Sequence, residues 1–174
     1  MCELLKWTTK APTKDSNTLS SDNPVTTADP DPLVKMNVGL NDAWYYQVTS
    51  GQGFFINVFP DIGYVSLSWF TYDTELPPLD AMANLGDPGH RWLMALGTYT
   101  GSQAVMDVSI TSGGIFDTPT EVTEVHDGTI ILSFADCENG TVEYDIPSIG
   151  QSGTVPIKRV VSDNIALCET LNTD

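Results

Sequence analysis

An all-β domain is predicted from three features of the sequence. Apolar and polar residues alternate with a period of two, most clearly in Val65–Trp69, where serines separate the apolar positions. Segments of this kind recur between clusters of glycine, proline, asparagine and aspartate, which favour turns. No stretch of about a dozen residues has the 3.6-residue period of a helix. Because the connections look local, we expect an antiparallel up-and-down meander closing as a β-barrel of about eight to ten strands, with a two-sheet β-sandwich as the alternative.

The first predicted strands follow one another along the chain. Phe54–Phe59 and Val65–Trp69 flank the turn residues Pro60–Gly63, as in a β-hairpin. Two more alternating strands are expected over Trp92–Leu96 and Ala104–Ile110.

Later strands are expected to open at glycines. A Gly-Thr sequence followed by Ile or Val begins at Gly128, Gly140 and Gly153. Asp127–Gly128 and Asn139–Gly140 are dipeptides that tolerate the positive φ angles of tight turns, so both predict turns. Pro156 lies inside the last expected strand, and because proline has no N–H, it predicts a sheet edge or a bulge.

The beginning of the chain differs in composition from the rest. Residues 8–32 are rich in Thr, Ser, Asn, Asp and Pro, and apolar residues occur there singly. Such a segment buries too little apolar surface to offset its ordering entropy. We therefore expect a flexible polar linker or tether over residues 1–35 and a single all-β domain over residues 36–174.

Cys2 is a candidate lipidation site. A cysteine at the amino terminus followed by a polar tether looks like a mature bacterial lipoprotein whose signal was replaced by a start methionine. The alternative is an ordinary cytosolic start, because Glu3 follows at once and no apolar run of a signal peptide is visible.

The two other cysteines, Cys137 and Cys168, are candidates for a disulfide. A bridge between them would pin the carboxyl-terminal segment to the sheet and would suit an oxidising compartment. Two buried free thiols in a cytosolic protein are the alternative.

Charge excludes several partners. The chain has 23 acidic and 7 basic residues, which gives a formal net charge of −16. Nucleic-acid binding is not expected, because neutralising phosphates requires a basic face. No apolar segment is long enough to predict a transmembrane helix.

The long connection Asp73–His90 is expected either to gate a ligand or contact a partner, or to be a plain surface insertion.

Candidates for chemistry are weak. His90 and His126 have acidic neighbours, but no G-x-S-x-G nucleophile motif accompanies them. Glu143 and Asp145 share one face of a strand, which is typical of a solvated surface, and Asp117–Glu121 lacks the spacing of a calcium loop. We assign no catalytic residue, no metal site and no cofactor.

Aromatic residues are concentrated in one part of the chain, with twelve of the sixteen between Trp44 and Tyr99. In the strand around Val65–Trp69 they occupy both faces, which predicts either a sheet covered on two sides or an aromatic face that binds a ligand. The candidate ligand-binding residues are Tyr45, Tyr46, Tyr64, Phe70 and Tyr72.

Several motifs together resemble those of a family of exported, β-rich proteins of Gram-negative bacteria. They are Trp44-Tyr45, Ser50-Gly51-Gln52-Gly53-Phe54, Trp69-Phe70-Thr71-Tyr72-Asp73, Arg91-Trp92, Phe134-x-Asp136-Cys137-x-x-Gly140-Thr141 and Pro156-Ile157-x-Arg159. The resemblance covers about residues 38–170. Its members are described only as hypothetical or exported proteins and lipoproteins, so it implies a location and a Cys137–Cys168 bridge, but no activity.

The expected function is that of a non-enzymatic, exported β-domain that binds a small molecule, a glycan or a cell-envelope partner through its aromatic face. The alternatives are a structural or protein-interaction module of the envelope and a hydrolase that uses clustered carboxylates. We expect a periplasmic, outer-membrane-anchored or extracellular location, with a cytoplasmic location as the alternative because no signal peptide is visible.

Overall fold

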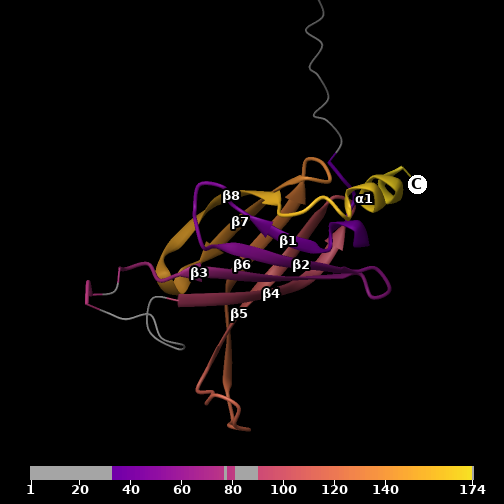
Figure 1. The fold of residues 1–174 in the computed structure, drawn as a ribbon. Coiled ribbons are helices and arrows are strands. Elements are labelled where there is room, and N and C mark those ends of the chain that lie inside the picture. The colour runs from indigo at the N-terminus through magenta and orange to yellow at the C-terminus, as the bar shows by residue number, and fades with distance from the viewer. Residues whose placement is uncertain (1–32, 77, 81–89, 174) are drawn as a thin grey trace, which may run out of the picture.

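The computed structural model describes residues 33–76, 78–80 and 90–173. Its core is a closed barrel of eight antiparallel strands, in which each strand pairs with the next along the chain and β8 returns to β1 (Figure 1). The prediction of an antiparallel meander that closes as a barrel is confirmed, and the two-sheet sandwich is not formed. Cys2 and most of the predicted tether lie outside the described residues.

The elements follow in a simple order. The strands are β1 (Asp42–Tyr45), β2 (Gly53–Phe59), β3 (Tyr64–Tyr72), β4 (His90–Thr100), β5 (Gln103–Ser112), β6 (Thr123–Phe134), β7 (Asn139–Ile146) and β8 (Gln151–Arg159). In the described residues, three short helices accompany them: η1 (Val38–Leu40), η2 (Pro147–Ile149) and α1 (Ile165–Asn172). β5 and β6 continue past the barrel as a long hairpin that projects from it (Figure 1).

The alternation seen in the sequence sorts side chains to the two sides of the barrel wall. In β3, Val65, Leu67 and Trp69 are buried in the interior, while Tyr64 and Phe70 are exposed on the outside. The same alternation continues through β2 and β5. The inward side chains form one continuous apolar core that fills most of the barrel.

One predicted turn is wrong. Asp127–Gly128 does not open a strand but lies inside β6, where the register with β5 shifts between Asp107 and Ser109. Gly128 has a φ of 101°, and a Cβ there would lie 1.9 Å from the carbonyl oxygen of Asp145. The positive φ that suggested a turn therefore serves a β-bulge, where it also lets β7 approach closely.

The barrel closes through a short seam. β1 pairs with β8 only at Trp44–Arg159 and Tyr45–Lys158. Pro156 pairs with Thr141 of β7 and has no partner on its β1 side. A proline is suited to that position because its missing N–H faces no strand.

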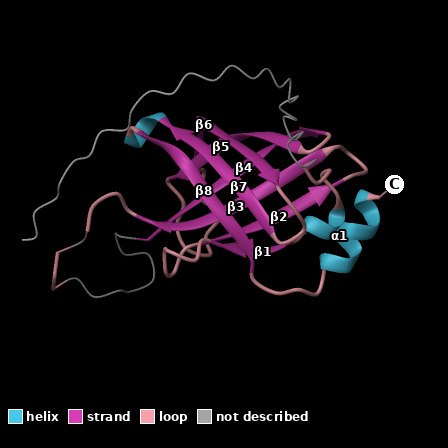
Figure 2. Ribbon diagram, turned by 90° about the horizontal axis from the view of Figure 1, so that it is seen from above, coloured by secondary structure: helices cyan, strands magenta, loops and turns pink. Residues whose placement is uncertain are grey.

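One end of the barrel is covered by the segments that precede β1 and follow β8, and we call it the closed end (Figures 1 and 2). Val34 is buried and its N–H donates to the carbonyl oxygen of Phe134 at 3.0 Å. η1 packs against α1 so closely that a Cβ at Gly39 would lie 2.3 Å from the Cys168 nitrogen. α1 is eight residues long, too short for the helical periodicity sought in the sequence.

The predicted disulfide is present at this closed end. The sulfur atoms of Cys137, in the turn between β6 and β7, and Cys168, in α1, are 2.01 Å apart. The 31-residue separation between the two cysteines spans β7, β8 and the segment that leads to α1. The bridge therefore fastens the helix that covers the barrel end to the barrel wall.

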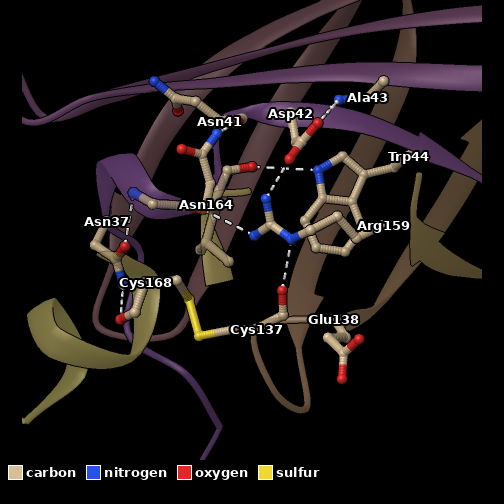
Figure 3. A network of polar contacts seen from close by, with 12 residues as sticks. Asn37, Asn41, Asp42, Ala43, Trp44, Cys137, Glu138, Arg159, Asn164 and Cys168 are labelled. Atoms are coloured by element: carbon tan, nitrogen blue, oxygen red, sulfur yellow. Dashed lines mark hydrogen bonds and ion pairs between the residues drawn. A yellow bond between two sulfur atoms is a disulfide. The ribbon is translucent and has the colours of Figure 1, made fainter. Parts of the chain in front are cut away.

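A buried ion pair lies beside the disulfide (Figure 3). Arg159 Nη1 donates to Asp42 Oδ2 at 2.6 Å, and the two side chains are 2% and 8% exposed. Arg159 also donates to the carbonyl oxygens of Cys137 and Gly39, each at 2.8 Å, and its guanidinium lies 4.6 Å from the centre of the Trp44 ring. One side chain thus joins β8 to β1, to η1 and to the disulfide turn.

The turn between β6 and β7 is held by Asp136. Partial burial alone would raise the pKa of this carboxyl group, but three hydrogen bonds oppose that effect: one from the Asn139 side chain and two from the backbone N–H groups of Glu138 and Asn139. With the positive charge of Lys158 nearby, they bring the pKa of Asp136 below its ordinary value of 3.8.

We expect the substitution Asp136→Asn to lower the melting temperature at neutral pH and to matter less in acid. A carboxylate with a lowered pKa stabilises the folded state above its ordinary pKa, and this contribution is lost as the pH falls through the lowered value. Thermal unfolding of both proteins between about pH 7 and pH 2 measures the effect. A difference in melting temperature that stays constant across this range contradicts the assignment.

Candidate functional site

The barrel end opposite the closed end contains a small open cavity, which we call the mouth cavity. Its walls come from the ends of β3 and β7 and the starts of β4 and β8, with Gln52 before β2 and Ile149 of η2 at its rim. The volume is about 260 Å³. An adjoining space of about 190 Å³ shares Leu93, Ile146 and Ile149 and extends it toward Ile110. A cavity of this size accommodates about one ring of a ligand.

Trp69 forms the aromatic wall of the mouth cavity. Its ring stacks on Phe54 of β2, with centroids 5.2 Å apart and an interplanar angle of 30°. Tyr144 of β7 meets it at 64° and the same 5.2 Å separation from across the barrel. These two contacts fix the plane of the indole, so that its orientation toward the cavity is set before any ligand arrives.

The indole N–H of Trp69 has no hydrogen-bond partner among the residues that the structure describes. Trp69 is 7% exposed and lines the mouth cavity, and among the described residues no acceptor lies within hydrogen-bond distance of its Nε1 atom. The other buried tryptophan, Trp44, donates from Nε1 to the carbonyl oxygen of Leu40 at 3.2 Å. A buried donor without a partner costs about 1–3 kcal/mol, so an acceptor in the cavity would relieve a cost that the folded protein already carries.

The rim of the mouth cavity is polar and is held in place by neighbouring residues. Thr71 Oγ1 donates to Gln52 Oε1. Gly51, in the turn before β2, has a φ of 77°, and a Cβ there would lie 1.9 Å from the Tyr72 hydroxyl. This position therefore requires glycine. Asp73 is the only carboxylate that the described residues contribute to the lining.

η2 is positioned at this rim by Asp127. The Asp127 side chain is buried, and its Oδ1 accepts from the backbone N–H of Ser148 at 3.0 Å while its Oδ2 accepts from the Ser148 hydroxyl. The bulge at Gly128 places Asp127 next to η2, within hydrogen-bond distance of Ser148. Asp127 thus holds η2 in place, and η2 contributes Ile149 to the rim of the mouth cavity.

The structure does not bring the five predicted ligand-binding residues together. Tyr72 lines the mouth cavity, and Phe70 lies beside it on the outside of the barrel. Tyr64 is at the other end of the same nine-residue strand, roughly 26 Å from Tyr72 at 3.3 Å per residue. Tyr45 lies at the seam near Lys158, and Tyr46 follows it at the end of β1.

Sequence reasoning missed Trp69 and Tyr144. Each lies two positions from a buried residue of its own strand, so the alternation placed both on the inward face. What it did not show is that the inward positions at this end of the barrel border an open cavity. That property depends on which barrel end the terminal segments cover.

The other chemical candidates lie elsewhere. His126 Nδ1 is 3.9 Å from Asp107 Oδ1, and both side chains are more than half exposed on the outside of the barrel, beside the bulge between β5 and β6. Glu143 and Asp145 are exposed on the outside of β7. Asp117–Glu121 lies at the tip of the β5–β6 hairpin, and the side chain of His90 is outside the described residues. Within the described ranges, no three His, Cys, Asp or Glu side chains gather as a metal site requires.

Comparisons with protein-family models, curated proteins and solved structures find no match to this chain. In the described part of the chain, no helix has the length and apolar character needed to cross a membrane.

Proposed function

We propose that this domain is a non-enzymatic binding protein whose mouth cavity takes up a small, neutral molecule of about one ring. The observation that carries the proposal is the buried Nε1–H of Trp69, a residue that lines the cavity, because this donor has no acceptor among the described residues. A ligand oxygen or nitrogen that accepts from this group would satisfy it, while the aromatic ring of Trp69 and the side chains of Leu93 and Ile146 cover the apolar part of the ligand.

The chemistry of the lining narrows the ligand class. The inner part of the cavity is apolar, and the rim offers the amide, hydroxyl and carboxylate groups of Gln52, Thr71 and Asp73. Asp73 and the net charge of −16 disfavour an anionic ligand. A single sugar ring or a small aromatic carbonyl compound meets these requirements, because each combines a flat apolar surface with hydrogen-bond acceptors.

The location that we propose is the cell envelope or the exterior of the cell. The Cys137–Cys168 disulfide supports it, because such bridges persist in oxidising compartments. The resemblance to exported proteins agrees with it, and lipidation of Cys2 would tether the domain to a membrane.

The binding proposal is tested by following the four tryptophan indole N–H signals in a two-dimensional nitrogen–hydrogen NMR spectrum. The probes are neutral one-ring compounds: methyl pyranosides on one side, and benzamide and acetophenone on the other. We expect at least one compound to shift the Trp69 signal while the Trp44 signal, whose donor is bound to Leu40, stays in place. If no compound in either group shifts the Trp69 signal at millimolar concentration, the proposal is wrong.

The substitution Trp69→Phe should weaken binding of a compound found in this way. Phenylalanine keeps an aromatic wall but removes the indole donor, and one neutral hydrogen bond is worth about 0.5–1.5 kcal/mol, or roughly 2- to 13-fold in affinity. Trp44→Phe is the matched control, since it removes a tryptophan donor at the closed end and should leave the affinity unchanged. Isothermal titration calorimetry measures both, and equal affinities for the Trp69→Phe and wild-type proteins would count against the role of the indole.

A further inference from the structure

The outside of the barrel carries a continuous apolar surface over β2, β3 and β4, which we call the outer apolar patch. Its centre consists of Phe55, Phe70, Trp92, Met94 and Leu96, which are between 40% and 58% exposed. The outer face of a small soluble barrel ordinarily presents polar residues to water. A cluster of large apolar side chains there therefore indicates an interaction surface.

The strand register makes the members of the patch neighbours. Phe70 lies directly opposite Trp92 across β3 and β4. The rings of Phe55 and Phe70 meet edge to face with centroids 5.7 Å apart. Met94 and Leu96 follow Trp92 at alternate positions of β4, and Ser68 and Ser66 of β3 lie opposite them. Phe55, Phe70 and Trp92 are thus direct neighbours, and Met94 and Leu96 continue the row along β4 beside the two serines.

The size of the patch matches that of a specific protein interface. Three further exposed apolar residues extend it toward the closed end: Phe59, Tyr64 and Val105. At roughly 100 Å² for each half-exposed large side chain, the eight residues expose about 800 Å². Each partner contributes about 800 Å² to an interface of standard size, whereas the largest apolar patch of an ordinary monomer covers about 300–600 Å².

Charge indicates which partner fits. The chain has a formal charge of −16, yet none of the eight patch residues is charged, and the nearest carboxylate in the strand register is Asp107, opposite Leu96. A cationic partner would be drawn to the acidic surfaces elsewhere on the molecule. Another copy of this chain is repelled by those surfaces, so the uncharged patch is where it can approach without bringing carboxylates together.

We propose that the outer apolar patch is a contact surface between two copies of this chain, related by a two-fold axis so that the same patch serves both. Because a closed barrel has no free edge strand, the two copies meet through the outer faces of their strands. Trp92 also borders the space that adjoins the mouth cavity, but the proposal does not depend on ligand binding.

The oligomeric state of the full chain tests this proposal through sedimentation velocity over a range of protein concentrations. We expect a dimer that strengthens when salt is raised from about 0.02 M to about 0.5 M, because salt screens the repulsion between acidic chains and leaves the apolar contact intact. A monomer at every protein concentration and every salt concentration overturns the proposal. The patch would then be a surface that binds a different protein.

Two matched variants show whether the patch forms the contact. Trp92→Glu places a charge at the centre of the patch and should weaken the dimer by roughly 30-fold or more. Leu167→Glu adds the same charge at an exposed apolar position of α1, away from the patch, and should weaken it little. Because Trp92 is 58% exposed, its replacement should leave the fold intact, which circular dichroism checks. A dimer that both variants weaken equally, or that Trp92→Glu leaves unchanged, contradicts the proposal.

Discussion

Replacing Arg159 with methionine should lower the free energy of unfolding by about 3–5 kcal/mol, the cost of removing one partner from a buried ion pair. The Asp42 carboxylate would stay buried without its counter-charge, and the carbonyl oxygens of Cys137 and Gly39 would lose their donors. Methionine keeps much of the side-chain volume, so the loss reports on charge and hydrogen bonding more than on packing. Urea unfolding followed by circular dichroism measures it.

Two further variants separate the contributions of charge and geometry. In the double variant Arg159→Met, Asp42→Asn, the buried charge is absent, and we expect a large part of the lost stability to return. Arg159→Lys keeps the charge, but a single ammonium nitrogen cannot reach all three acceptors that the guanidinium nitrogens Nε, Nη1 and Nη2 bind. The stability of this variant should therefore fall between those of the wild type and Arg159→Met. A loss below about 1 kcal/mol for Arg159→Met contradicts the account of the closed end.

Removing the Cys137–Cys168 bridge should lower the free energy of unfolding by about 3–4 kcal/mol. The chain-entropy model gives this value for a closed loop of the observed 31-residue separation. The loss should also release α1, which the bridge fastens over the barrel end beside η1. Urea unfolding of the Cys137→Ser, Cys168→Ser double variant measures it, and reductant should lower the stability of the wild type but not of this variant. Equal stability of the two proteins in oxidising buffer, with Cys137 and Cys168 already reactive toward a thiol reagent, contradicts the assignment.

The barrel could be predicted from the sequence because its information is local. Alternation in Val65–Trp69 sets which side chains point inward, and the turn residues between strands favour pairing of neighbours. In a meander of such hairpins, closing the sheet into a barrel pairs its two edge strands with each other. The sequence predicted about eight to ten strands and kept a two-sheet sandwich as the alternative, whereas the structure has eight strands in one closed barrel.

The closed end could not be predicted, because it depends on contacts between distant parts of the chain. Arg159 reaches Asp42 across 117 residues of sequence, and Asn37 reaches Cys168 across 131. Nothing near Arg159 in the sequence marks it as a buried residue. α1 has eight residues and is held by the disulfide and by η1, so its own sequence carries little helical signal.

The candidate site was only partly predictable for the same reason. The aromatic strand around Tyr72 pointed to the region of the mouth cavity, but because aromatic residues occupy both faces of this strand, the candidates were chosen from the face opposite Val65, Leu67 and Trp69. The proposed site depends on an inward tryptophan whose donor has no partner in the described part of the chain, and that is a property of three-dimensional packing. Gly128 shows the reverse case, since its positive φ was predictable while its use in a bulge was not.

The central claim is that the mouth cavity binds a ligand through Trp69. A crystal structure of the domain with a compound selected by the NMR titration tests it most directly. The account predicts the compound inside the cavity, with an acceptor atom about 2.7–3.2 Å from Trp69 Nε1 and its ring against the side chains of Leu93 and Ile146. A compound bound anywhere else, or one bound in the cavity while Trp69 Nε1 donates to an atom of the protein itself, would contradict it.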